Sequence, residues 1–423
     1  MSDDDRTTPA AAGEWRRNGH LVALTAAGLT CAPTTLPPYT IGVFVAPFTH
    51  DFGWSRGAIQ TAILFSTGLG VLCAPLAGAM IRRFGIRRTI LAGLAGIALA
   101  CLCGAVMQGA LWQLYLVYAL MALLGAGAGG IGWTTLLAER FTASRGLALG
   151  IGLSGTGLCA ILMPQVASIS MAAWGWRGAY VALAGIALLI VLPPCAWLLP
   201  TRRQEAAAVM ADRVAEPGAF TVKAAVRHWR FWMLGASTAC IYLAVGGAIP
   251  NLVPALTDKG ISARDAATVM SIFGGAIVVG RIAIGALVDR FWASAVASVV
   301  LAGATIGALV LSGDASFTSY AIAAAMLGMV TGTELDIIGF LTARYFGLAD
   351  FARIYARVYI FVAAAAGVAP LIFGYLSDLT GSYRAPFLIA AGLLVAGAAG
   401  LLSLGRYPDL SRAATTDSAQ ASL

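Results

Sequence analysis

Twelve apolar segments, each close to the length that crosses a lipid bilayer, follow one another along this sequence. A helix needs about 20 mainly apolar residues to span the hydrocarbon layer. Within that layer the backbone polar groups must bond to one another, which restricts a spanning chain to helices or a closed barrel. We therefore expect an all-α membrane protein with twelve transmembrane helices. The segments are 21–46, 58–81, 90–108, 113–138, 147–171, 178–199, 231–256, 266–288, 294–312, 318–341, 354–377 and 385–405.

The twelve segments form two groups of six. Residues 200–230 are polar and charged, and we predict that they link an N-terminal six-helix bundle at 21–199 to a C-terminal bundle at 231–405. Residues 1–20 and 406–423 are expected to be tails. The first tail is polar and lacks the basic start of a secretory signal, so the first apolar segment is expected to stay as a helix.

The second group of segments repeats the first at an offset of 207 residues. Three separated stretches agree on this offset, which indicates two similar halves in tandem, as in transporters with parallel repeats. Arg281 has Ala74 as its counterpart, so the second half has gained a charge that the repeat does not require. The matching sets are Pro254, Asp258, Gly260 and Ser262 with Pro47, Asp51, Gly53 and Ser55; Gly285 and Phe291 with Gly78 and Phe84; and Tyr383, Arg384 and Phe387 with Trp176, Arg177 and Tyr180.

The basic residues predict the orientation in the membrane. If both termini are cytoplasmic, 21 of the 27 Lys and Arg lie in cytoplasmic segments, five lie in outer loops, and Arg281 lies inside a span. Cytoplasmic loops of membrane proteins are enriched in Lys and Arg. We therefore expect cytoplasmic termini and a multi-pass protein of the cell membrane, with the bacterial inner membrane as its location. This placement of the charges argues against nucleic acid as the partner of the net charge of +8.

Prolines inside two apolar segments predict interruptions. Pro37 and Pro38 lie in the first segment, and Pro250 and Pro254 lie in the seventh. Proline removes a helix hydrogen bond and clashes with the preceding turn, so we expect both helices to break or kink. In transporters, broken helices at matching places in two halves point to a substrate site.

The loop after the second segment carries a recognisable signature. It reads Gly78-Ala-Met-Ile-Arg82-Arg83-Phe84-Gly85-Ile-Arg87-Arg88, and Asp289-Arg290 occupies the equivalent place in the second half. It resembles the loop signature of the major facilitator superfamily, Gly-x-x-x-Asp-Arg-x-Gly-Arg/Lys-Arg/Lys, with Arg82 where that family usually has Asp. The resemblance implies a cytoplasmic gate of charged residues, in which Arg82 alters the usual first-half contact. Its members here are Arg82, Arg83, Arg87, Asp289 and Arg290.

Three further stretches resemble the monocarboxylate porter and oxalate:formate antiporter branch of that superfamily. They are Phe52-Gly-Trp-Ser-Arg56, Arg145-Gly-Leu-Ala-Leu-Gly-Ile151, and Gly332-Thr-Glu-Leu-Asp336 continuing to Arg344-Tyr-Phe-Gly347. In this branch an arginine in the eighth span binds the substrate carboxylate, and Arg281 matches its position. Monocarboxylate porters also carry an acid one turn earlier, where this chain has Ile277.

Glu334 and Asp336 are the only acidic residues deep inside a span. From the helical rise of about 1.5 Å per residue, Glu334 lies at a depth similar to that of Arg281. In the arrangement that the resemblance implies, the two side chains can meet across the central cavity. Asp336 points about 200° away from Glu334, so only one acid can face the arginine. One interpretation is a pair that exchanges with substrate or proton, and the other is a permanent structural ion pair.

These observations predict secondary transport of a small organic anion, with a monocarboxylate as the favoured substrate, by alternating access. Arg281 is expected to take the carboxylate, while Glu334 or Asp336 carries a coupling proton or balances Arg281. Whether transport is coupled to protons stays open. The weaker candidates for polar contacts, chosen because they lie in cavity-lining spans, are Thr34, Thr35, Tyr39, Gln165, Tyr242 and Asn251.

The sequence fits a transporter better than an enzyme. Gly152-Leu-Ser154-Gly155 looks like the serine motif of rhomboid proteases, which needs a histidine base within reach, and all three histidines lie at span ends. No HExxH, P-loop or paired metal ligands occur, so we expect no enzyme, no cofactor and no metal. The alternatives left open are an efflux carrier for hydrophobic or drug-like compounds and a non-transporting receptor. The lipid bilayer is an expected partner, and the chain is expected to act as a monomer.

Overall fold

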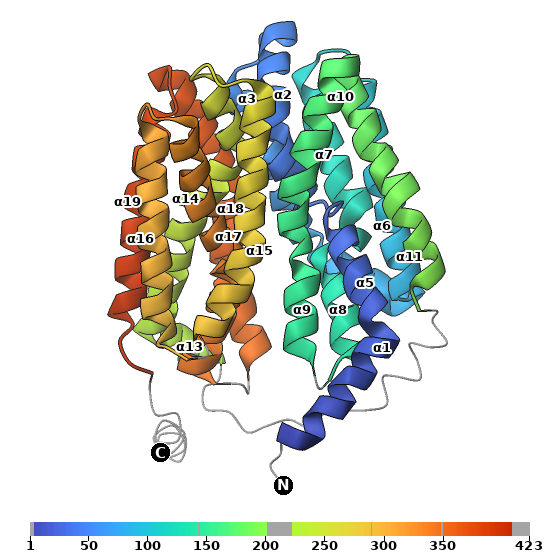
Figure 1. Ribbon diagram of the computed structural model, residues 1–423, viewed down its shortest axis with the longest axis vertical. Coiled ribbons are helices and arrows are strands. Elements are labelled where there is room, and N and C mark those ends of the chain that lie inside the picture. Colours follow the sequence, from blue (N-terminus) through green and yellow to red (C-terminus); the bar gives the residue numbers. More distant parts are fainter. Residues whose placement is uncertain (1–3, 143, 201–221, 289, 348–349, 408–423) are drawn as a thin grey trace.

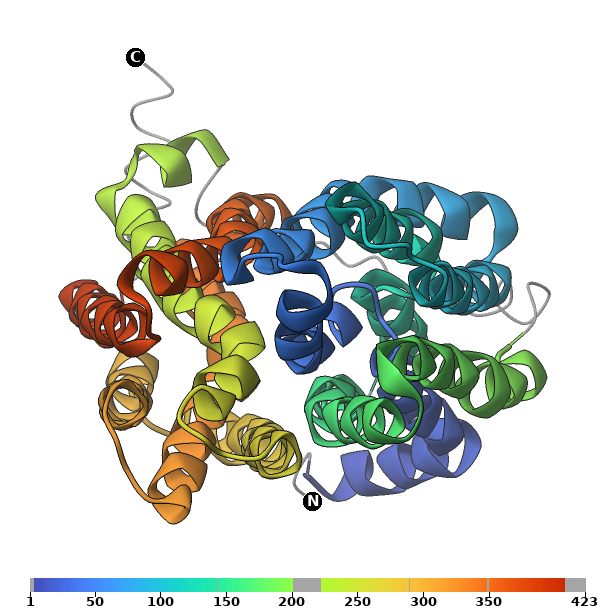
Figure 2. The same cartoon turned by 90° about the horizontal axis from the view of Figure 1, so that it is seen from above.

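The computed structural model describes residues 4–142, 144–200, 222–288, 290–347 and 350–407, and in these ranges the secondary structure is helical, without strands. The helices of the N-terminal half and those of the C-terminal half form two clusters side by side, coloured blue to green and yellow to red (Figure 1). Seen from above, α2 lies between the two clusters (Figure 2).

The N-terminal half contains several helices that are interrupted inside the predicted spans. Its elements are α1 (Asp4–Leu29), α2 (Leu36–Phe52), α3 (Arg56–Gln60), a π-helical segment (Leu64–Gly68), α4 (Leu69–Leu72), α5 (Ala74–Phe84), α6 (Ile86–Ala105), α7 (Leu111–Gly125), a 3-10 turn (Ala126–Ala128), α8 (Gly130–Arg140), α9 (Arg145–Leu153), α10 (Gly155–Gly185), a second π-helical segment (Ile186–Val191) and α11 (Leu192–Leu198).

The C-terminal half is built from longer, continuous helices. A short helix, α13 (Val222–Arg227), precedes them. The six long helices are α14 (Trp229–Thr257), α15 (Ala263–Val288), α16 (Ala293–Ser312), α17 (Phe317–Phe346), α18 (Phe351–Thr380) and α19 (Arg384–Ser403). Each corresponds to one of the six apolar segments predicted for this half.

Within the described residues, eight helices are long and apolar enough to cross a membrane, or nine if the bent α17 is counted as one span. One of the eight, Arg145–Leu198, reverses direction at Trp174 and Gly175, where the φ of Gly175 is +68°. Glycine adopts this left-handed conformation without steric penalty. That stretch therefore holds two predicted spans, and the interrupted helices before α6 supply the first two.

The first predicted span is broken, as its prolines indicate. α1 ends at Leu29, a turn follows, and α2 begins at Leu36 with proline in its first turn. Proline is tolerated there because the first N–H groups of a helix have no intrahelical partner.

A break or kink was predicted for the seventh span, and the break does not occur, because α14 continues through Pro250 and Pro254. Pro254 has no N–H to donate to the carbonyl of Pro250, and Gln60 Nε2 fills that place at 3.1 Å. One turn earlier, Asn251 Nδ2 donates to the carbonyl of Gly247 at 2.8 Å. Side chains thus satisfy carbonyls beside the prolines, and the helix remains whole.

Small residues bring α15 and α17 into backbone contact. A Cβ added at Gly332 would lie 2.2 Å from the carbonyl oxygen of Ile277, and one added at Gly280 would lie 2.7 Å from that of Met329. Glycine at such positions lets two membrane helices approach closely. Arg281 directly follows Gly280, and Glu334 lies two residues after Gly332. The contact between the helices therefore fixes the relative positions of Arg281 and Glu334.

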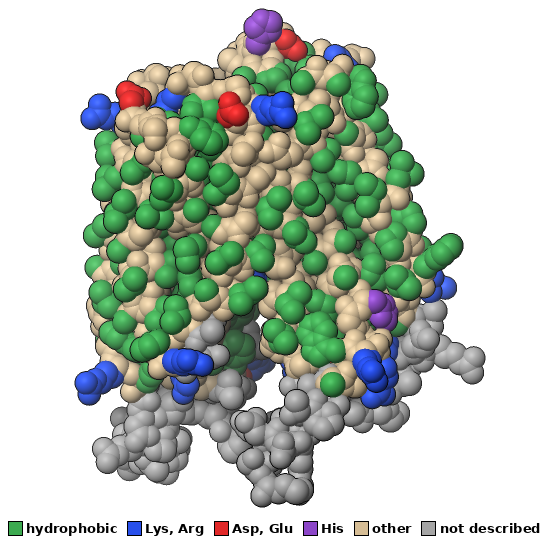
Figure 3. Space-filling model, viewed as in Figure 1, with side chains coloured by type: hydrophobic (Ala, Val, Ile, Leu, Met, Phe, Trp, Pro, Cys, Tyr) green, Lys and Arg blue, Asp and Glu red, His purple; other side chains and the backbone are tan. Residues whose placement is uncertain are grey.

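Charged side chains lie mainly at the two ends of the molecule. Lys and Arg line the lower end, which also carries the chain termini, whereas most visible Asp and Glu lie at the upper end (Figure 3). The surface is hollowed at the lower end between the two halves. The broad side between the ends is covered largely by hydrophobic side chains, as expected for a surface that faces lipid.

Candidate functional site

A cavity of about 200 Å³ lies between the two halves, near the middle of the spans. The N-terminal half contributes the break between α1 and α2, the start of α2, the π-helical segment and α10. The C-terminal half contributes α14, α15, α17 and α18. The lining residues are Thr34, Thr35, Pro38, Tyr39, Ile63, Thr67, Thr156, Tyr242, Gly246, Ile249, Arg281, Thr331, Glu334, Tyr359, Val362, Ala363, Ala366 and Pro370.

One basic and one acidic side chain lie in this lining, Arg281 from α15 and Glu334 from α17. Both are close enough to act electrostatically on the hydroxyl of Tyr39. Tyr242 lies beside Glu334, within hydrogen-bonding reach of its carboxylate, and Tyr359 is a further neighbour of that carboxylate. The cavity lining therefore brings together one arginine, one glutamate and three tyrosines.

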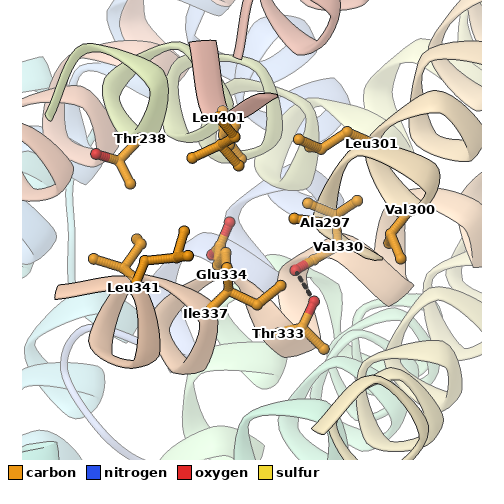
Figure 4. A pocket seen from close by; sticks show the side chains of 12 residues that line it. Thr238, Ala297, Val300, Leu301, Val330, Thr333, Glu334, Ile337, Leu341 and Leu401 are labelled. Atoms are coloured by element: carbon orange, nitrogen blue, oxygen red, sulfur yellow. Dashed lines mark hydrogen bonds between the residues drawn. The ribbon is translucent and has the colours of Figure 1, made fainter. Parts of the chain in front are cut away.

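Glu334 also borders a second, much smaller chamber inside the C-terminal half. This chamber measures about 20 Å³, and its other lining residues are apolar or threonine. The Glu334 side chain projects among these residues, next to Ile337 and Leu401 (Figure 4). A space of this size is just large enough for one water molecule. The side chain of Glu334 thus lies between the central cavity and a small chamber with room for one water molecule.

The structure brings together only part of the predicted polar set. Thr34, Thr35, Tyr39 and Tyr242 line the cavity with Arg281 and Glu334. The side chain of Asp336, although the residue belongs to α17, lies outside the described part of the structure.

Two of the predicted polar residues serve other contacts. Asn251 is fully buried and donates to its own helix, at Gly247. Gln165 of α10 donates to Thr268 and Ser271 of α15, at 3.3 and 3.2 Å. It therefore joins the two halves rather than lining the cavity.

Several lining residues were not predicted from the sequence, among them Tyr359, Thr67, Thr156 and Thr331. Threonine occurs throughout the spans, where its hydroxyl usually bonds the carbonyl one turn earlier. Thr331 does so with Leu327 at 3.1 Å. Only Tyr359 offered a usable signal, because it is a polar aromatic residue in an eleventh span that the family resemblance places at the cavity.

The upper end of the molecule is closed by contacts between the halves that sequence analysis also missed. Arg56 pairs with Asp258 at 2.7 Å, and the backbone N–H groups of Arg56 and Gly57 donate to the Asp378 carboxylate at 3.1 and 2.8 Å. The Arg56 guanidinium also lies over the Tyr383 ring, 5.2 Å from its centre. Each of these contacts joins the start of α3 to the C-terminal half.

The environment of Asp258 is partly desolvated. Burial raises the pKa of its carboxyl group above the ordinary value of 3.8, while the nearby Arg56 guanidinium acts in the opposite direction. Backbone packing reinforces the closure, because a Cβ on Gly57 would lie 2.5 Å from the Tyr375 ring. The signal for Arg56 and Asp258 was available, since Asp258 begins the second copy of the repeated Asp-x-Gly-x-Ser stretch and Arg56 directly follows the first copy.

The predicted gate residues lie at the opposite end. Arg82, Arg83 and Arg290 are exposed, and Arg87 donates to the carbonyl of Ala196. Asp289 lies outside the described residues. The ion pair between the halves that the described residues give, Arg56 with Asp258, lies at the upper end, which matches a molecule closed above the cavity and hollowed below it (Figure 3).

Comparison with known proteins gives a consistent result. A family model described as the Major Facilitator Superfamily matches residues 21–333 and 234–423. Monocarboxylate transporter 13 of Bos taurus is 29% identical over 386 residues, which is 87% of this chain and 85% of that protein. Monocarboxylate transporter 11 of Homo sapiens is 26% identical over 371 residues, 81% and 74% of the two chains.

A solved structure with the same fold is that of a bacterial homologue of the human lysosomal transporter Spinster, in an inward-facing and occupied conformation. It aligns with a TM-score of 0.62 over 91% of this chain and 97% of that chain, at 15% identity. At this identity the likeness shows the fold alone. The fold and the relatives are those of membrane transporters.

Proposed function

The chain belongs to the major facilitator superfamily, and on that premise we propose that it carries a small organic anion with a carboxylate group across the membrane. The observation that carries this proposal is Arg281 in the lining of the central cavity. A guanidinium group binds a carboxylate through two parallel hydrogen bonds. The similarity to monocarboxylate transporters supports the same substrate class.

The cavity suits a small substrate. Its volume of about 200 Å³ is below the usual range of about 300–1,000 Å³ for drug-sized ligands. Apolar side chains such as Ile63, Ile249 and Val362 provide the surface for a hydrocarbon tail. A monocarboxylate with a short apolar or hydroxylated tail therefore matches the lining better than a bulky drug-like compound.

Glu334 is the residue that we assign to proton coupling. Binding of a carboxylate to Arg281 leaves Glu334 as an uncompensated negative charge in the middle of the membrane, which is energetically unfavourable. A proton taken up with the substrate neutralises that charge. The neighbouring small chamber, lined by apolar groups and threonines, offers a neutral carboxyl group a place away from the substrate.

Alternating access follows from the two ends of the cavity. Contacts between the halves close the upper end, where Arg56 meets Asp258. The basic lower end faces the cytoplasm in this proposal. Both termini then lie on the cytoplasmic side of a bacterial inner membrane, and the monomer is the working unit.

The orientation can be tested by labelling. An impermeant thiol reagent should label a cysteine at Asp314 from outside, and labelling only from the cytoplasm would contradict this orientation.

The test of the substrate class is uptake into proteoliposomes of short monocarboxylates and of the corresponding neutral amides. The acids should enter and the amides should not, and Arg281→Lys should take up the acids at least tenfold more slowly. The matched control is Arg264→Gln, which changes an exposed arginine in the first turn of α15, outside the cavity. Equal uptake of acid and amide by the unaltered protein would exclude the carboxylate as the recognised group.

A further inference from the structure

A second large cavity lies in the C-terminal half, at the end of the molecule that carries the chain termini. It measures about 800 Å³ and is bounded by the ends of α15 and α17, the start of α16 and the residues after α19. It is separate from the central cavity and shares no lining residue with it. Its lining residues are Val288, Arg290, Phe291, Trp292, Phe340, Arg344, Gly405, Arg406 and Tyr407.

Three arginines from different parts of the chain converge on this cavity. Arg290 follows α15, Arg344 belongs to the last turn of α17, and Arg406 follows α19. All three are exposed, and the described lining contains no acidic residue. Like charges gathered around one cleft repel one another and create a positive potential that attracts an anion.

Aromatic contacts hold this basic cleft in shape. The Arg344 guanidinium lies 5.1 Å from the centre of the Phe340 ring and 5.7 Å from that of Tyr407. The Tyr407 hydroxyl accepts the backbone N–H of Ala293 at 3.1 Å, and Tyr345 donates to the carbonyl of Gly405 at 2.5 Å. These hydrogen bonds join the segment after α19 to the start of α16 and to the last turn of α17. They hold Arg406 at the cleft.

The cleft also has an apolar edge. Phe291 is 61% exposed and lies three residues after the end of α15, and Trp292 adds a second large ring beside it. Aromatic side chains at this depth are typical of the boundary between lipid tails and head groups. An anion that fits the cleft can therefore carry a hydrocarbon portion on this side.

We propose that the cleft formed by Arg290, Arg344 and Arg406 binds the phosphate group of an anionic phospholipid from the adjacent leaflet. Arginine pairs with phosphate oxygens through parallel hydrogen bonds. Basic pockets between membrane helices on one side of the bilayer recognise lipid head groups in this way. Inorganic phosphate shares the chemistry, but it makes no use of the apolar edge at Phe291. This inference is independent of the transported substrate.

The test compares lipids on the purified full-length protein in detergent. Native mass spectrometry should detect bound phosphatidylglycerol, whereas phosphatidylcholine, whose choline group is cationic, should be retained at least tenfold less. The variant Arg344→Gln with Arg406→Gln should lose about tenfold or more in phosphatidylglycerol affinity, because charge-assisted hydrogen bonds disappear. The matched control is Arg16→Gln with Arg88→Gln, two exposed arginines outside the cleft.

The outcomes separate the possible ligands. Equal loss of lipid in the control variant would mean general charge attraction and would overturn the site, as would full retention in the Arg344 and Arg406 variant. Binding of inorganic phosphate with no selective binding of phosphatidylglycerol would overturn the lipid as the source. If the double variant does not yield folded protein, Arg406→Gln alone, beyond the last helix, should still show several-fold weaker lipid retention, and unchanged retention would count against the site.

Discussion

Arg281 is the residue on which the functional assignment depends most. It lies in the cavity together with Glu334, so two roles must be distinguished. In the first the arginine binds the substrate carboxylate, and in the second it only neutralises the acid. A buried ion pair can often be replaced by neutral groups with little loss of stability. The two roles therefore differ in what happens when both charges are removed.

We predict that Arg281→Ala combined with Glu334→Gln folds well but does not transport the anionic substrate. Loss of the guanidinium removes charge-assisted hydrogen bonds worth about 1.5–3 kcal/mol each. Uptake in proteoliposomes should fall to background, while thermal unfolding stays within a few degrees of the parent. Recovery of substantial anion transport in the double variant would show that Arg281 is a structural counter-ion.

Glu334 gives a separate prediction about proton coupling. Glu334→Gln cannot exchange a proton, so accumulation driven by a pH gradient should be lost. Counterflow of preloaded substrate should persist, because exchange does not require release of the proton. Thr331→Val, which replaces another lining side chain without changing charge, is the control. Gradient-driven uptake by Glu334→Gln at the parent rate would rule out this residue as the coupling site.

The sequence alone indicated the charged residues of the cavity better than its neutral ones. Arg281 and Glu334 stand out because charge inside an apolar segment is rare and energetically unfavourable. Asn251 and Gln165 are polar as well, yet the structure uses them at Gly247 of the same helix and at α15. Which way a neutral side chain faces depends on helix rotation, and apolar periodicity in a span surrounded by lipid defines that rotation poorly.

At the scale of the helix, glycines at the contact between α15 and α17 set the position of Arg281 relative to Glu334. A Cβ at Gly332 would come within 2.2 Å of the Ile277 carbonyl oxygen, whereas one at Gly275 of α15 would meet nothing within 4 Å. Both substitutions by alanine favour the helix itself by up to about 1 kcal/mol. The difference in the free energy of unfolding between Gly332→Ala and Gly275→Ala therefore measures the contact between α15 and α17.

Gly332→Ala should destabilise the protein by about 1–3 kcal/mol through overpacking, and transport should fall because Arg281 moves relative to Glu334. Gly275→Ala should be neutral or slightly stabilising. The measurement is thermal unfolding in detergent together with initial uptake rates. A Gly332→Ala protein as stable and as active as Gly275→Ala would disprove the tight contact.

The proline pattern illustrates what local sequence misses at this scale. Pro37 and Pro38 coincide with a break because they stand in the first turn of a new helix. Pro250 and Pro254 lie inside α14, which stays whole. Gln60, 190 residues away in sequence, donates to the buried carbonyl of Pro250, which has no N–H partner at Pro254. A partner so distant along the chain is invisible to an argument from one helix.

At the scale of the whole molecule, the architecture could be predicted from the sequence. The twelve-helix fold is confirmed, and so is the resemblance to the superfamily and its monocarboxylate branch. Long apolar segments, a repeat and a loop signature all act over many residues, which makes them robust. Which end of the molecule is closed could not be predicted from the sequence, because it depends on contacts between the halves, such as the ion pair of Arg56 and Asp258.

That pair leads to a prediction for the closed upper end. Burial in the closed form raises the pKa of Asp258 above its ordinary value of 3.8. On opening, the carboxyl group becomes hydrated and its pKa returns toward that value. The closed form then binds the proton more tightly, so acid favours closure, and closure weakens as the pH rises from 3.8 through the raised pKa. At higher pH the dependence ends, because Asp258 is ionised in both forms.

The accessibility of a cavity cysteine from outside measures this equilibrium. We place a cysteine at Ile249, which lines the cavity, in a background without the seven native cysteines. Its labelling rate is divided by that of a cysteine at the exposed Asp314 to remove the intrinsic pH dependence of the thiol. The ratio should rise as the pH increases from 3.8 through the raised pKa of Asp258. Asp258→Asn should abolish the rise, because it removes the titrating carboxyl group. Arg56, the Asp378 carboxylate and the Tyr383 hydroxyl, which also face this contact, remain in place in that variant. A ratio that falls as the pH rises would mean that the ion pair itself, rather than the desolvation of its acid, controls the opening of the outer face.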